Sequence, residues 1–175
     1  MGARTRVRAV ALAAVSCAVV LGLDLASKAW AWESLRHQRA VSVIDGLLRF
    51  EFAFNTGSAF GLADQVDSAR PMFIVITLAV LLYLGRMLAR LPTQATTSFV
   101  ALGLFAGGAL GNLHDRLVRH LWIFDRGDRY GVVDFIVVAW GPRAWPAFNV
   151  ADVGLCVGVL MLLLGLRRRL RAEAG

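Results

Sequence analysis

Four long apolar segments constrain this chain more than any other feature of its sequence. A helix needs around 20 mostly apolar residues to cross about 30 Å of hydrocarbon, and residues 9–30, 71–88, 98–113 and 147–166 reach or approach that length. Hydrophobic residues make up 58% of the 175 residues, and a mean hydropathy of +0.62 is too high for a soluble domain of this size. The sequence therefore predicts one membrane-embedded domain over residues 1–175, of the all-α class and built as a four-helix transmembrane bundle.

The third apolar segment differs from the others because it is short and rich in glycine. Gly103, Gly107, Gly108 and Gly111 all lie within residues 98–113. Residues without a side chain let a neighbouring helix approach the backbone closely, which is typical of helix interfaces in membranes. We expect this helix to lie at the centre of the bundle.

Arginine marks the ends of the predicted spans. Three short segments, 1–8, 86–97 and 167–175, carry nine arginines in 29 residues, and basic residues beside a span favour the cytoplasmic side. Both termini are therefore predicted in the cytoplasm, with residues 31–70 and 114–146 on the outer side. The net charge of +7 has the same origin. Because the arginines flank apolar segments and form no stripe with interleaved aromatic residues, nucleic-acid binding is not expected.

The first apolar segment has a competing interpretation as a cleaved signal peptide. Arg4, Arg6 and Arg8 precede it, and the residues ending at Cys17 resemble a weak lipoprotein cleavage box. The apolar run continues past this cysteine to Leu25, however, which is longer than a signal core usually is. We therefore expect the segment to remain as a membrane-spanning helix.

The two outer connections carry different structural signals. Within residues 47–60, four phenylalanines alternate partly with polar or small residues, and period-two spacing predicts a short strand. In the second connection, charged residues surround Gly127, which favours a solvated turn between two ordered pieces. The phenylalanines of the first connection are Phe50, Phe52, Phe54 and Phe60.

Two aspartates lie among apolar residues, where an ionised side chain is costly. Asp152 is at the start of the fourth apolar segment, and Asp134 lies 18 residues upstream. An aspartate at the centre of a membrane helix costs roughly 2.5 to 3.5 kcal/mol, so a functional role is its default interpretation. Burial and a like-charged neighbour both raise the pKa of a carboxyl group, so a converging pair would share one proton near neutral pH.

Such a pair can hydrolyse a peptide bond without a metal or a nucleophilic side chain. The ionised partner takes a proton from the attacking water, and the protonated partner donates to the forming oxyanion or the leaving amine. The structural alternative is that Asp134 and Asp152 each cap a helix or pair with an arginine. Metal binding and a cofactor are not expected, because none of the three histidines has a ligand-type partner at short spacing. Cys17 and Cys156 give neither a disulfide framework nor a metal spacing.

Other polar residues are candidates to support the pair. Asp24 and Lys28 are four residues apart near the outer end of the first span, in the order that favours an ion pair. They would hold substrate or, alternatively, orient the helix at the interface with the lysine reaching the headgroups. Asn55 follows Phe54 in a glycine-containing stretch, where it could bond an extended peptide or, alternatively, a structural turn.

The end of the third span carries a polar cluster. Helical spacing places Asn112, Asp115 and Arg116 along one face, so these side chains can point together toward the bundle interior or its mouth. Arg116 could pair with a carboxylate or with the carbonyl oxygens of a bound peptide, since its guanidinium stays charged. A salt bridge that only positions the helix is the alternative. His114 is predicted to be a surface residue.

These residues together resemble the lipoprotein signal peptidases, the type II signal peptidases of bacteria. The resemblance covers nearly the whole chain, and several motifs occur in the same order. The motifs are DLASK (24–28), FNTGSAFG (54–61), GGALGNLHDR (107–116), VVDF (132–135) and FNVAD (148–152).

This resemblance implies a structure and an activity. The family is a four-helix membrane bundle with a small periplasmic β-cradle, and its members are aspartic endopeptidases of the bacterial cytoplasmic membrane. They remove the signal peptide from diacylglyceryl-modified prolipoproteins just before the lipobox cysteine and are inhibited by globomycin-type compounds. A monomer at the membrane lipid, with its site toward the periplasmic face, is expected.

The resemblance also implies the roles of individual residues. The catalytic pair corresponds to Asp134 and Asp152. The positions that bind substrate or support the site correspond to Asp24, Lys28, Asn55, Asn112, Asp115, Arg116 and Asn149.

One departure from the family concerns residues 117–130, which form a longer connection than the family usually has before the first catalytic motif. Two rival interpretations of the chain also stay open at this point. One is a non-enzymatic membrane binder or small transporter whose acids carry protons or cations. The other is a family member that has lost activity and only binds precursors, although every acid of the motifs is present.

Overall fold

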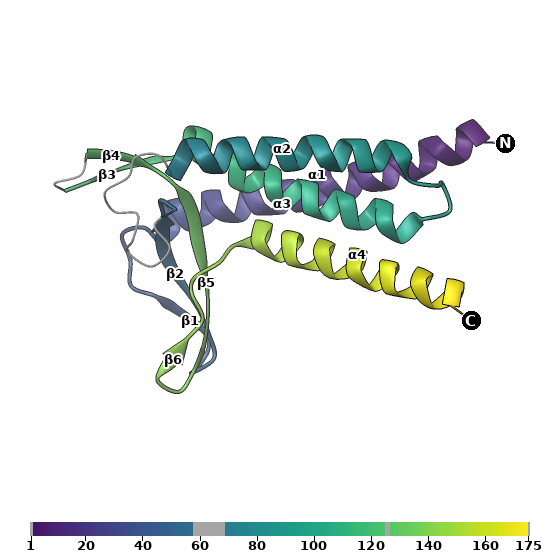
Figure 1. The fold of residues 1–175 in the computed structure, drawn as a ribbon. Helices are drawn as coiled ribbons and strands as arrows, with labels where there is room; N and C mark the ends of the chain where they lie inside the picture. Colours follow the sequence, from purple (N-terminus) through teal and green to yellow (C-terminus); the bar gives the residue numbers. More distant parts are fainter. Residues whose placement is uncertain (1, 58–68, 125–126, 175) are drawn as a thin grey trace.

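The four predicted helices are present, and each is long and apolar enough to cross a membrane. The computed structural model describes residues 2–57, 69–124 and 127–174. The N-terminal end of the first helix and the C-terminal end of the last lie at the same end of the bundle (Figure 1). The helices are α1 (Gly2–Ser34), α2 (Ala69–Arg90), α3 (Thr96–Val118) and α4 (Val150–Ala174).

The helices extend beyond the predicted apolar spans, except at the start of α4. A helix that leaves the hydrocarbon can continue with polar residues, which is why α1 includes the arginine-containing N-terminal segment. The fourth span was predicted to begin at residue 147, but α4 begins at Val150 because Asn149 caps it. The Oδ1 of Asn149 accepts the Asp152 N–H at 3.0 Å, and the Asp152 Oδ2 accepts the Asn149 N–H at 3.1 Å. This reciprocal pair is a capping box and fixes where the helix starts.

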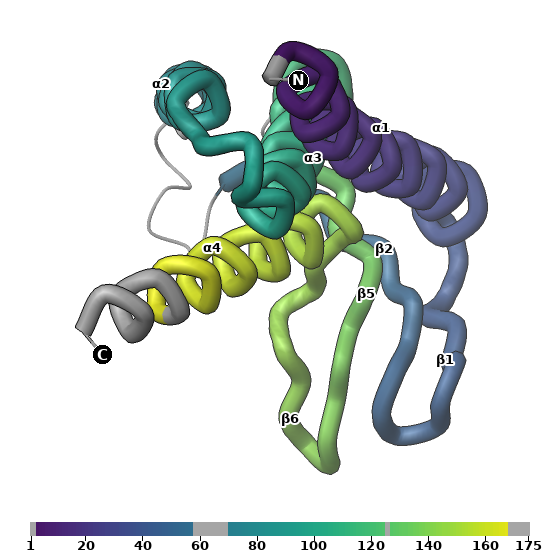
Figure 2. Tube along the Cα trace, turned by 90° about the vertical axis from the view of Figure 1, so that its right-hand side faces the viewer, coloured from purple at the N-terminus to yellow at the C-terminus, as the bar shows by residue number. Residues whose placement is uncertain are grey.

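The glycine-rich helix α3 is central, as its sequence predicts. It contacts α1, α2 and α4 (Figure 2). A Cβ atom on Gly107 would lie 2.6 Å from the Cys17 carbonyl oxygen of α1, and one on Gly108 would overlap the Ala151 carbonyl oxygen of α4. Because only glycine permits these approaches, α1 and α4 both pack directly on the backbone of α3. The apolar stretch of α3 is 50% buried, against 6% for α2.

A four-stranded antiparallel sheet lies at one end of the bundle, opposite the start of α1 and the end of α4 (Figure 1). Its strand order is β1-β2-β5-β6, and a separate hairpin pairs β3 with β4. The all-α class expected from the apolar segments is therefore too narrow, because the described residues of the outer connections include six strands. These are β1 (Val41–Ile44), β2 (Leu48–Asn55), β3 (His120–Ile123), β4 (Gly127–Tyr130), β5 (Val132–Trp140) and β6 (Arg143–Ala144).

Aromatic residues join the sheet to the bundle. The alternating phenylalanines of the predicted strand occur in β2, although Phe60 lies outside the described residues. Trp32 of α1 makes edge contacts with Phe52 and Phe54, with ring centroids 5.8 and 5.9 Å apart. These rings pack against a buried cluster that includes Val133 of β5. The cluster therefore fixes β5 against the outer end of α1.

The connection between α3 and β5 contains the β3–β4 hairpin. Its strands pair from His120 with Tyr130 to Ile123 with Gly127, and Gly127 has a φ of 66°, in the left-handed region that glycine tolerates. The predicted turn at this glycine is therefore present, while residues 125–126 lie outside the described part. We call residues 120–130 the hairpin arm.

Candidate active site

The two candidate aspartates come from a strand and a helix that meet at the inner edge of the sheet. Asp134 is on β5, where its Cα pairs with that of Ala53 in β2. Asp152 is in the first turn of α4. The chain between them returns alongside β5, because the N–H groups of Phe135 and Ile136 both donate to the Phe148 carbonyl oxygen, at 3.1 and 2.9 Å. This backbone contact brings the start of α4 back beside Asp134.

Asn149 contacts both carboxyl groups. Its side-chain Nδ2 donates to the Asp134 Oδ1 at 2.6 Å, and its backbone N–H donates to the Asp152 Oδ2 at 3.1 Å. The side chain of Asn149 is fully buried, so water does not compete for these bonds. One residue therefore holds the two aspartates on either side of itself, as the sequence expectation of a converging pair requires.

Two further asparagines complete the hydrogen bonding of the pair. The Asn55 Nδ2 donates to the Asp134 Oδ2 at 3.1 Å, and the Asn112 Nδ2 donates to the Asp152 Oδ1 at 2.9 Å. Each of the four carboxyl oxygens thus accepts one N–H. A carboxylate has about four acceptor positions, so each group keeps capacity for a water or a substrate.

The two carboxyl groups lie in different surroundings. Asp134 is only 4% exposed. Burial, and secondarily the nearby charge of Asp152, raise the pKa of Asp134 to about 6, although the hydrogen bonds from Asn55 and Asn149 oppose the shift. Asp152 is half-buried in the first turn of α4, where its Oδ2 accepts the Asn149 N–H. The pair is therefore asymmetric.

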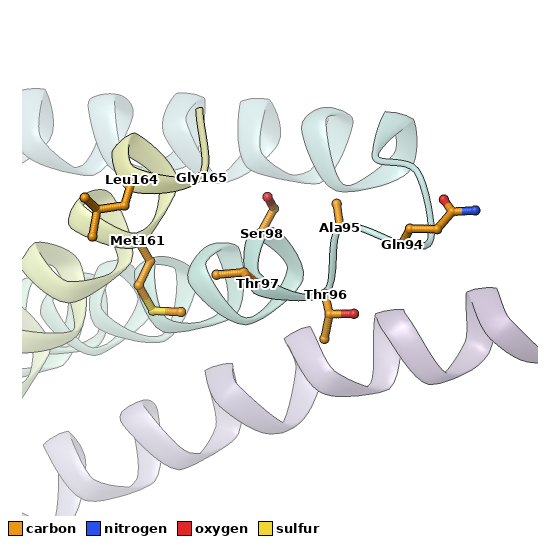
Figure 3. A pocket seen from close by; sticks show the side chains of 8 residues that line it. All are labelled: Gln94, Ala95, Thr96, Thr97, Ser98, Met161, Leu164 and Gly165. Atoms are coloured by element: carbon orange, nitrogen blue, oxygen red, sulfur yellow. The ribbon is translucent and has the colours of Figure 1, made fainter. Parts of the chain in front are cut away.

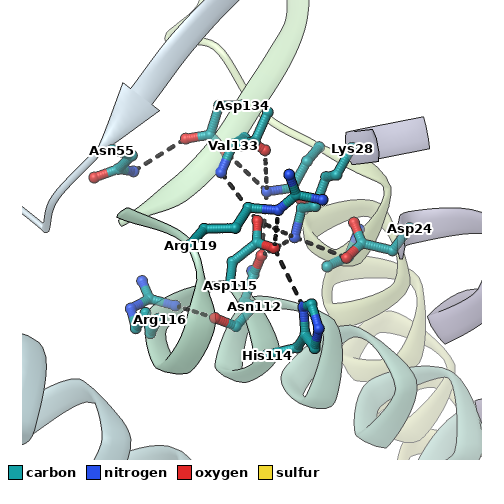
Figure 4. A network of polar contacts seen from close by, with 12 residues as sticks. Asp24, Lys28, Asn55, Asn112, His114, Asp115, Arg116, Arg119, Val133 and Asp134 are labelled. Atoms are coloured by element: carbon teal, nitrogen blue, oxygen red, sulfur yellow. Dashed lines mark hydrogen bonds and ion pairs between the residues drawn. The ribbon is translucent and has the colours of Figure 1, made fainter. Parts of the chain in front are cut away.

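A buried ion-pair network lies behind the asparagines (Figure 4). The Lys28 Nζ is 2.7 Å from the Asp24 Oδ2 and 3.5 Å from the Asp115 Oδ2, and it donates to the Asn112 Oδ1 at 2.8 Å. Lys28 and Asp24 are both 0% exposed. The alternative in which this lysine reaches the lipid headgroups is therefore wrong. Its ammonium instead orients the Asn112 amide, so that the Nδ2 faces Asp152.

The network also fixes the backbone around both aspartates. The Asp24 Oδ1 accepts the Ala151 N–H at 2.8 Å, immediately before Asp152. In the same way, the Asp115 Oδ2 accepts the Val133 N–H at 3.1 Å, immediately before Asp134. Each catalytic candidate is thus preceded by a residue whose N–H is held by a buried carboxylate.

Arg116 meets this network at a backbone carbonyl oxygen and not through an ion pair, although the sequence grouped it with Asn112 and Asp115. Its guanidinium lies 4.7 Å from the centre of the Phe73 ring of α2, and its Nη1 donates to the Asn112 carbonyl oxygen at 3.2 Å. The ion pairs among the described residues do not include it. His114 is exposed, as expected, with its Nδ1 3.5 Å from the Asp115 Oδ1.

Sequence reasoning missed one residue of the network. Arg119 pairs with Asp115, with its Nε 2.7 Å from the Oδ1. The signal that could have revealed it is the spacing of four residues, because an acid followed by a base at that distance in a helix forms an ion pair. The motif that carries the resemblance ends at Arg116, which adjoins Asp115 in sequence, and does not include Arg119.

Other potential sites in the described residues are less suited to chemistry. Within residues 2–57, 69–124 and 127–174, His, Cys, Asp and Glu side chains form no group of three that could hold a metal ion. A cleft of about 440 Å³ lies between the start of α3 and the C-terminal half of α4 (Figure 3). Its lining, which includes Thr96, Ser98 and Met161, contains no ionisable side chain.

Comparisons with known proteins identify the family of this chain. The family model described as signal peptidase (SPase) II matches residues 16–168, which include both aspartates. A protein named lipoprotein signal peptidase from Pseudomonas paraeruginosa is 41% identical over 152 residues, covering 86% of this chain and 84% of its own. Another of that name, from Geobacter metallireducens, is 35% identical over 158 residues, covering 90% and 91%.

Solved structures with a similar fold are also known. One, described as a bacterial membrane enzyme at 1.9 Å resolution, has a TM-score of 0.73 and 26% identity, covering 88% of this chain and 91% of its own. A second, described in the same words at 2.3 Å resolution, has a TM-score of 0.72 and 25% identity, covering 89% and 87%.

Proposed function

This chain belongs to the signal peptidase II family, and we propose that it hydrolyses prolipoproteins through the carboxyl groups of Asp134 and Asp152. The substrate is a diacylglyceryl-modified precursor, and the bond cut is the peptide bond just before the modified cysteine. The observation that carries this proposal is Asn149, whose side-chain and backbone N–H groups bond one aspartate each, at 2.6 and 3.1 Å.

The asymmetry of the pair supports an assignment of roles. Asp134, with its pKa raised to about 6 by burial, holds the proton. Asp152, the more exposed of the two carboxyl groups, takes the role of general base. This division resembles the way in which two carboxyl groups in different environments take acid and base roles.

The reaction then needs no other group to transfer protons. Asp152 takes one proton from the water molecule, and the water oxygen adds to the scissile carbonyl carbon. At the same time Asp134 donates its proton to the carbonyl oxygen. The tetrahedral intermediate collapses when its C–N bond breaks and the proton on Asp152 passes to the leaving amine. The hydroxyl proton returns to Asp134 as the carboxylic acid forms, so the pair ends in its starting state.

The position of the pair suits a lipid-anchored substrate. The strand β5 and the first turn of α4, which carry the two aspartates, lie at the sheet end of the bundle. The start of α1, the end of α4 and the α2–α3 connection, whose arginines favour the cytoplasm, are at the opposite end (Figure 1). The site thus faces the outer, periplasmic side of the bacterial cytoplasmic membrane. A diacylglyceryl group in the outer leaflet brings its own peptide bond to this level. All nine site residues come from one chain, so a monomer suffices, and globomycin-type inhibitors would occupy the same site.

Cleavage by the purified protein tests this function. A diacylglyceryl-modified precursor and the same precursor without the lipid are incubated with the protein in nanodiscs, with and without a chelator, and the products are identified by mass spectrometry. We expect cleavage of the lipidated precursor before the cysteine, unchanged by the chelator. Binding without cleavage would indicate an inactive family member, and ion flux without cleavage would indicate the transporter; either result overturns the proposal.

A further inference from the structure

Arg119 joins three parts of the structure although it belongs to none of the family motifs. It is the residue that ends α3, where its N–H donates to the Asp115 carbonyl oxygen at 2.8 Å. It also directly precedes the hairpin arm, whose first strand begins at His120. Its backbone therefore marks the point at which the chain leaves the bundle.

The side chain of Arg119 turns back toward the buried network. Its Nε bonds the Asp115 Oδ1 at 2.7 Å, and its guanidinium carbon lies 5.4 Å from the centre of the Trp32 ring of α1. The side chain is only 16% exposed. A charge-assisted bond at this depth is stronger than one on the surface, because water competes less for it.

Two hydrogen bonds tie the strand that carries Asp134 to the end of α3. The Gly131 N–H donates to the Arg119 carbonyl oxygen at 3.3 Å. The Val133 N–H donates to the Asp115 Oδ2 at 3.1 Å, on the carboxylate whose other oxygen Arg119 holds. Arg119 thus closes the base of the hairpin arm through its backbone and orients the acceptor of Val133 through its side chain.

The charges behind the pair are balanced by Arg119. Asp24 and Asp115 are both fully buried, and the cations paired with them are Lys28 and Arg119. Without Arg119, Asp115 would keep Lys28 and the exposed His114 beside it, and Lys28 would be drawn from Asn112 toward Asp115. A buried charge that loses its partner is costly, so the local structure would rearrange.

We propose that Arg119 is a positioning residue for Asp134 that lets this chain carry the hairpin arm without displacing its catalytic strand. The proposal rests on the proposed function for its catalytic part. Its structural part, the anchoring of Gly131 and Val133, is independent of any activity.

The test compares Arg119→Gln and Arg119→Lys with Arg143→Gln, which makes the same charge change at an exposed residue of β6. Hydrogen exchange of peptides containing Gly131 and Val133 is measured in nanodiscs, together with kcat/KM as a function of pH. We expect faster exchange in Arg119→Gln and a loss of kcat/KM of about 10- to 100-fold, as a displaced catalytic group causes. Arg119→Lys should recover part of both.

The pH profile separates positioning from a general loss of stability. Charged groups near Asp134 come from three helices, namely Lys28 of α1, Arg116 of α3 and Asp152 of α4. The Asp115 carboxylate that Arg119 holds is also faced by Lys28 and His114. Loss of the Arg119 charge leaves Asp115 less neutralised, which should raise the pKa of Asp134 and move the alkaline limb of kcat/KM to higher pH. Arg143→Gln should leave the limb in place.

Two results separate the positioning role of Arg119 from the proposed function. If Arg119→Gln matches Arg143→Gln in exchange, kcat/KM and pH profile, the proposal is overturned. If the wild-type chain does not cleave the precursor at all, the proposed function fails, but faster exchange at 131–133 in Arg119→Gln would still support the anchoring role.

Discussion

The Nδ2 of Asn149 lies 2.6 Å from the Oδ1 of Asp134, although 15 residues separate them in the chain. The same asparagine is the N-cap of α4 and accepts the Asp152 N–H. One side chain therefore contributes to helix initiation and to the geometry of the pair. These two contributions can be separated by substitution, because a cap needs only a short oxygen whereas contact with Asp134 needs the amide.

Asn149→Ser should lose activity without losing the helix cap. A serine hydroxyl caps as well as an asparagine, but it is too short to reach Asp134, whereas Asn149→Ala loses both and costs about 1 kcal/mol from the cap alone. We expect both variants to lose at least about 10-fold in kcat/KM and to have a lower Tm, because both remove the buried amide, with the larger loss of Tm for alanine, which also lacks the cap. Tm by intrinsic fluorescence and cleavage assays check this; full activity in Asn149→Ser would show that the contact with Asp134 is dispensable.

The activity should fall as pH rises above about 6. The proposed mechanism needs a proton on Asp134, whose raised pKa is about 6 in the free protein. Because kcat/KM reports the ionisation of the free enzyme, its alkaline limb should have a midpoint near that value. A rate profile between pH 4 and pH 9, with nanodisc integrity checked at each pH, measures it. A profile that rises through pH 6 to 8 would mean that both carboxyl groups must be ionised.

Asp134→Asn should make the protein more stable at neutral pH. The folded-state pKa of Asp134 lies above its ordinary value of 3.8, at about 6. The folded state therefore binds this proton more tightly than the unfolded state does. The contribution of Asp134 to the free energy of unfolding is fully present below pH 3.8 and is lost as pH rises through 6. At pH 7, ionising Asp134 in the folded state lowers the free energy of unfolding by at most about 3 kcal/mol. An asparagine at this position is never ionised and avoids this loss. Tm measured at pH 4 and pH 7 should show a gain confined to pH 7; an equal effect at both values contradicts the assignment.

Lys28→Met should destabilise the site by leaving Asp24 and Asp115 without their shared cation. Breaking a buried ion pair by removing one partner costs about 3 to 5 kcal/mol. The double variant Lys28→Met with Asp24→Asn removes one of the two negative charges and should recover part of the loss. A double-mutant cycle on Tm measures this coupling. Additive effects of the two substitutions would indicate that Lys28 and Asp24 act separately.

Several parts of this structure follow from local sequence signals. Hydropathy alone predicts the four helices, and the glycines of α3 predict its central position because close packing is a property of a residue without a side chain. The alternating phenylalanines predict β2, because period-two spacing is a local signal for a strand. In the candidate site, each of the nine expected residues bonds directly to at least one other of them, although Arg116 does so only at the Asn112 carbonyl oxygen.

Other parts depend on contacts that are distant in the chain. The extent of the sheet was underestimated, because β5 is stabilised by pairing with β2 about 80 residues upstream and not by its own alternation. The fully buried position of Lys28 could not be predicted from α1 alone. Its ammonium is held there by the Asp115 carboxylate and the Asn112 amide oxygen, which both belong to α3. Arg116 instead packs on Phe73, a residue of α2 with no motif to indicate it.

Cleavage by the two asparagine variants tests the central claim most directly, namely that the carboxyl groups of Asp134 and Asp152 carry out the hydrolysis. Asp134→Asn and Asp152→Asn, purified in nanodiscs and shown to retain wild-type hydrogen exchange in α3 and α4, are given the diacylglyceryl-modified precursor, and product is quantified by mass spectrometry. We predict that each variant loses at least about 100-fold in rate, as removal of a general acid or base does. Wild-type rates in either correctly folded variant would contradict the claim.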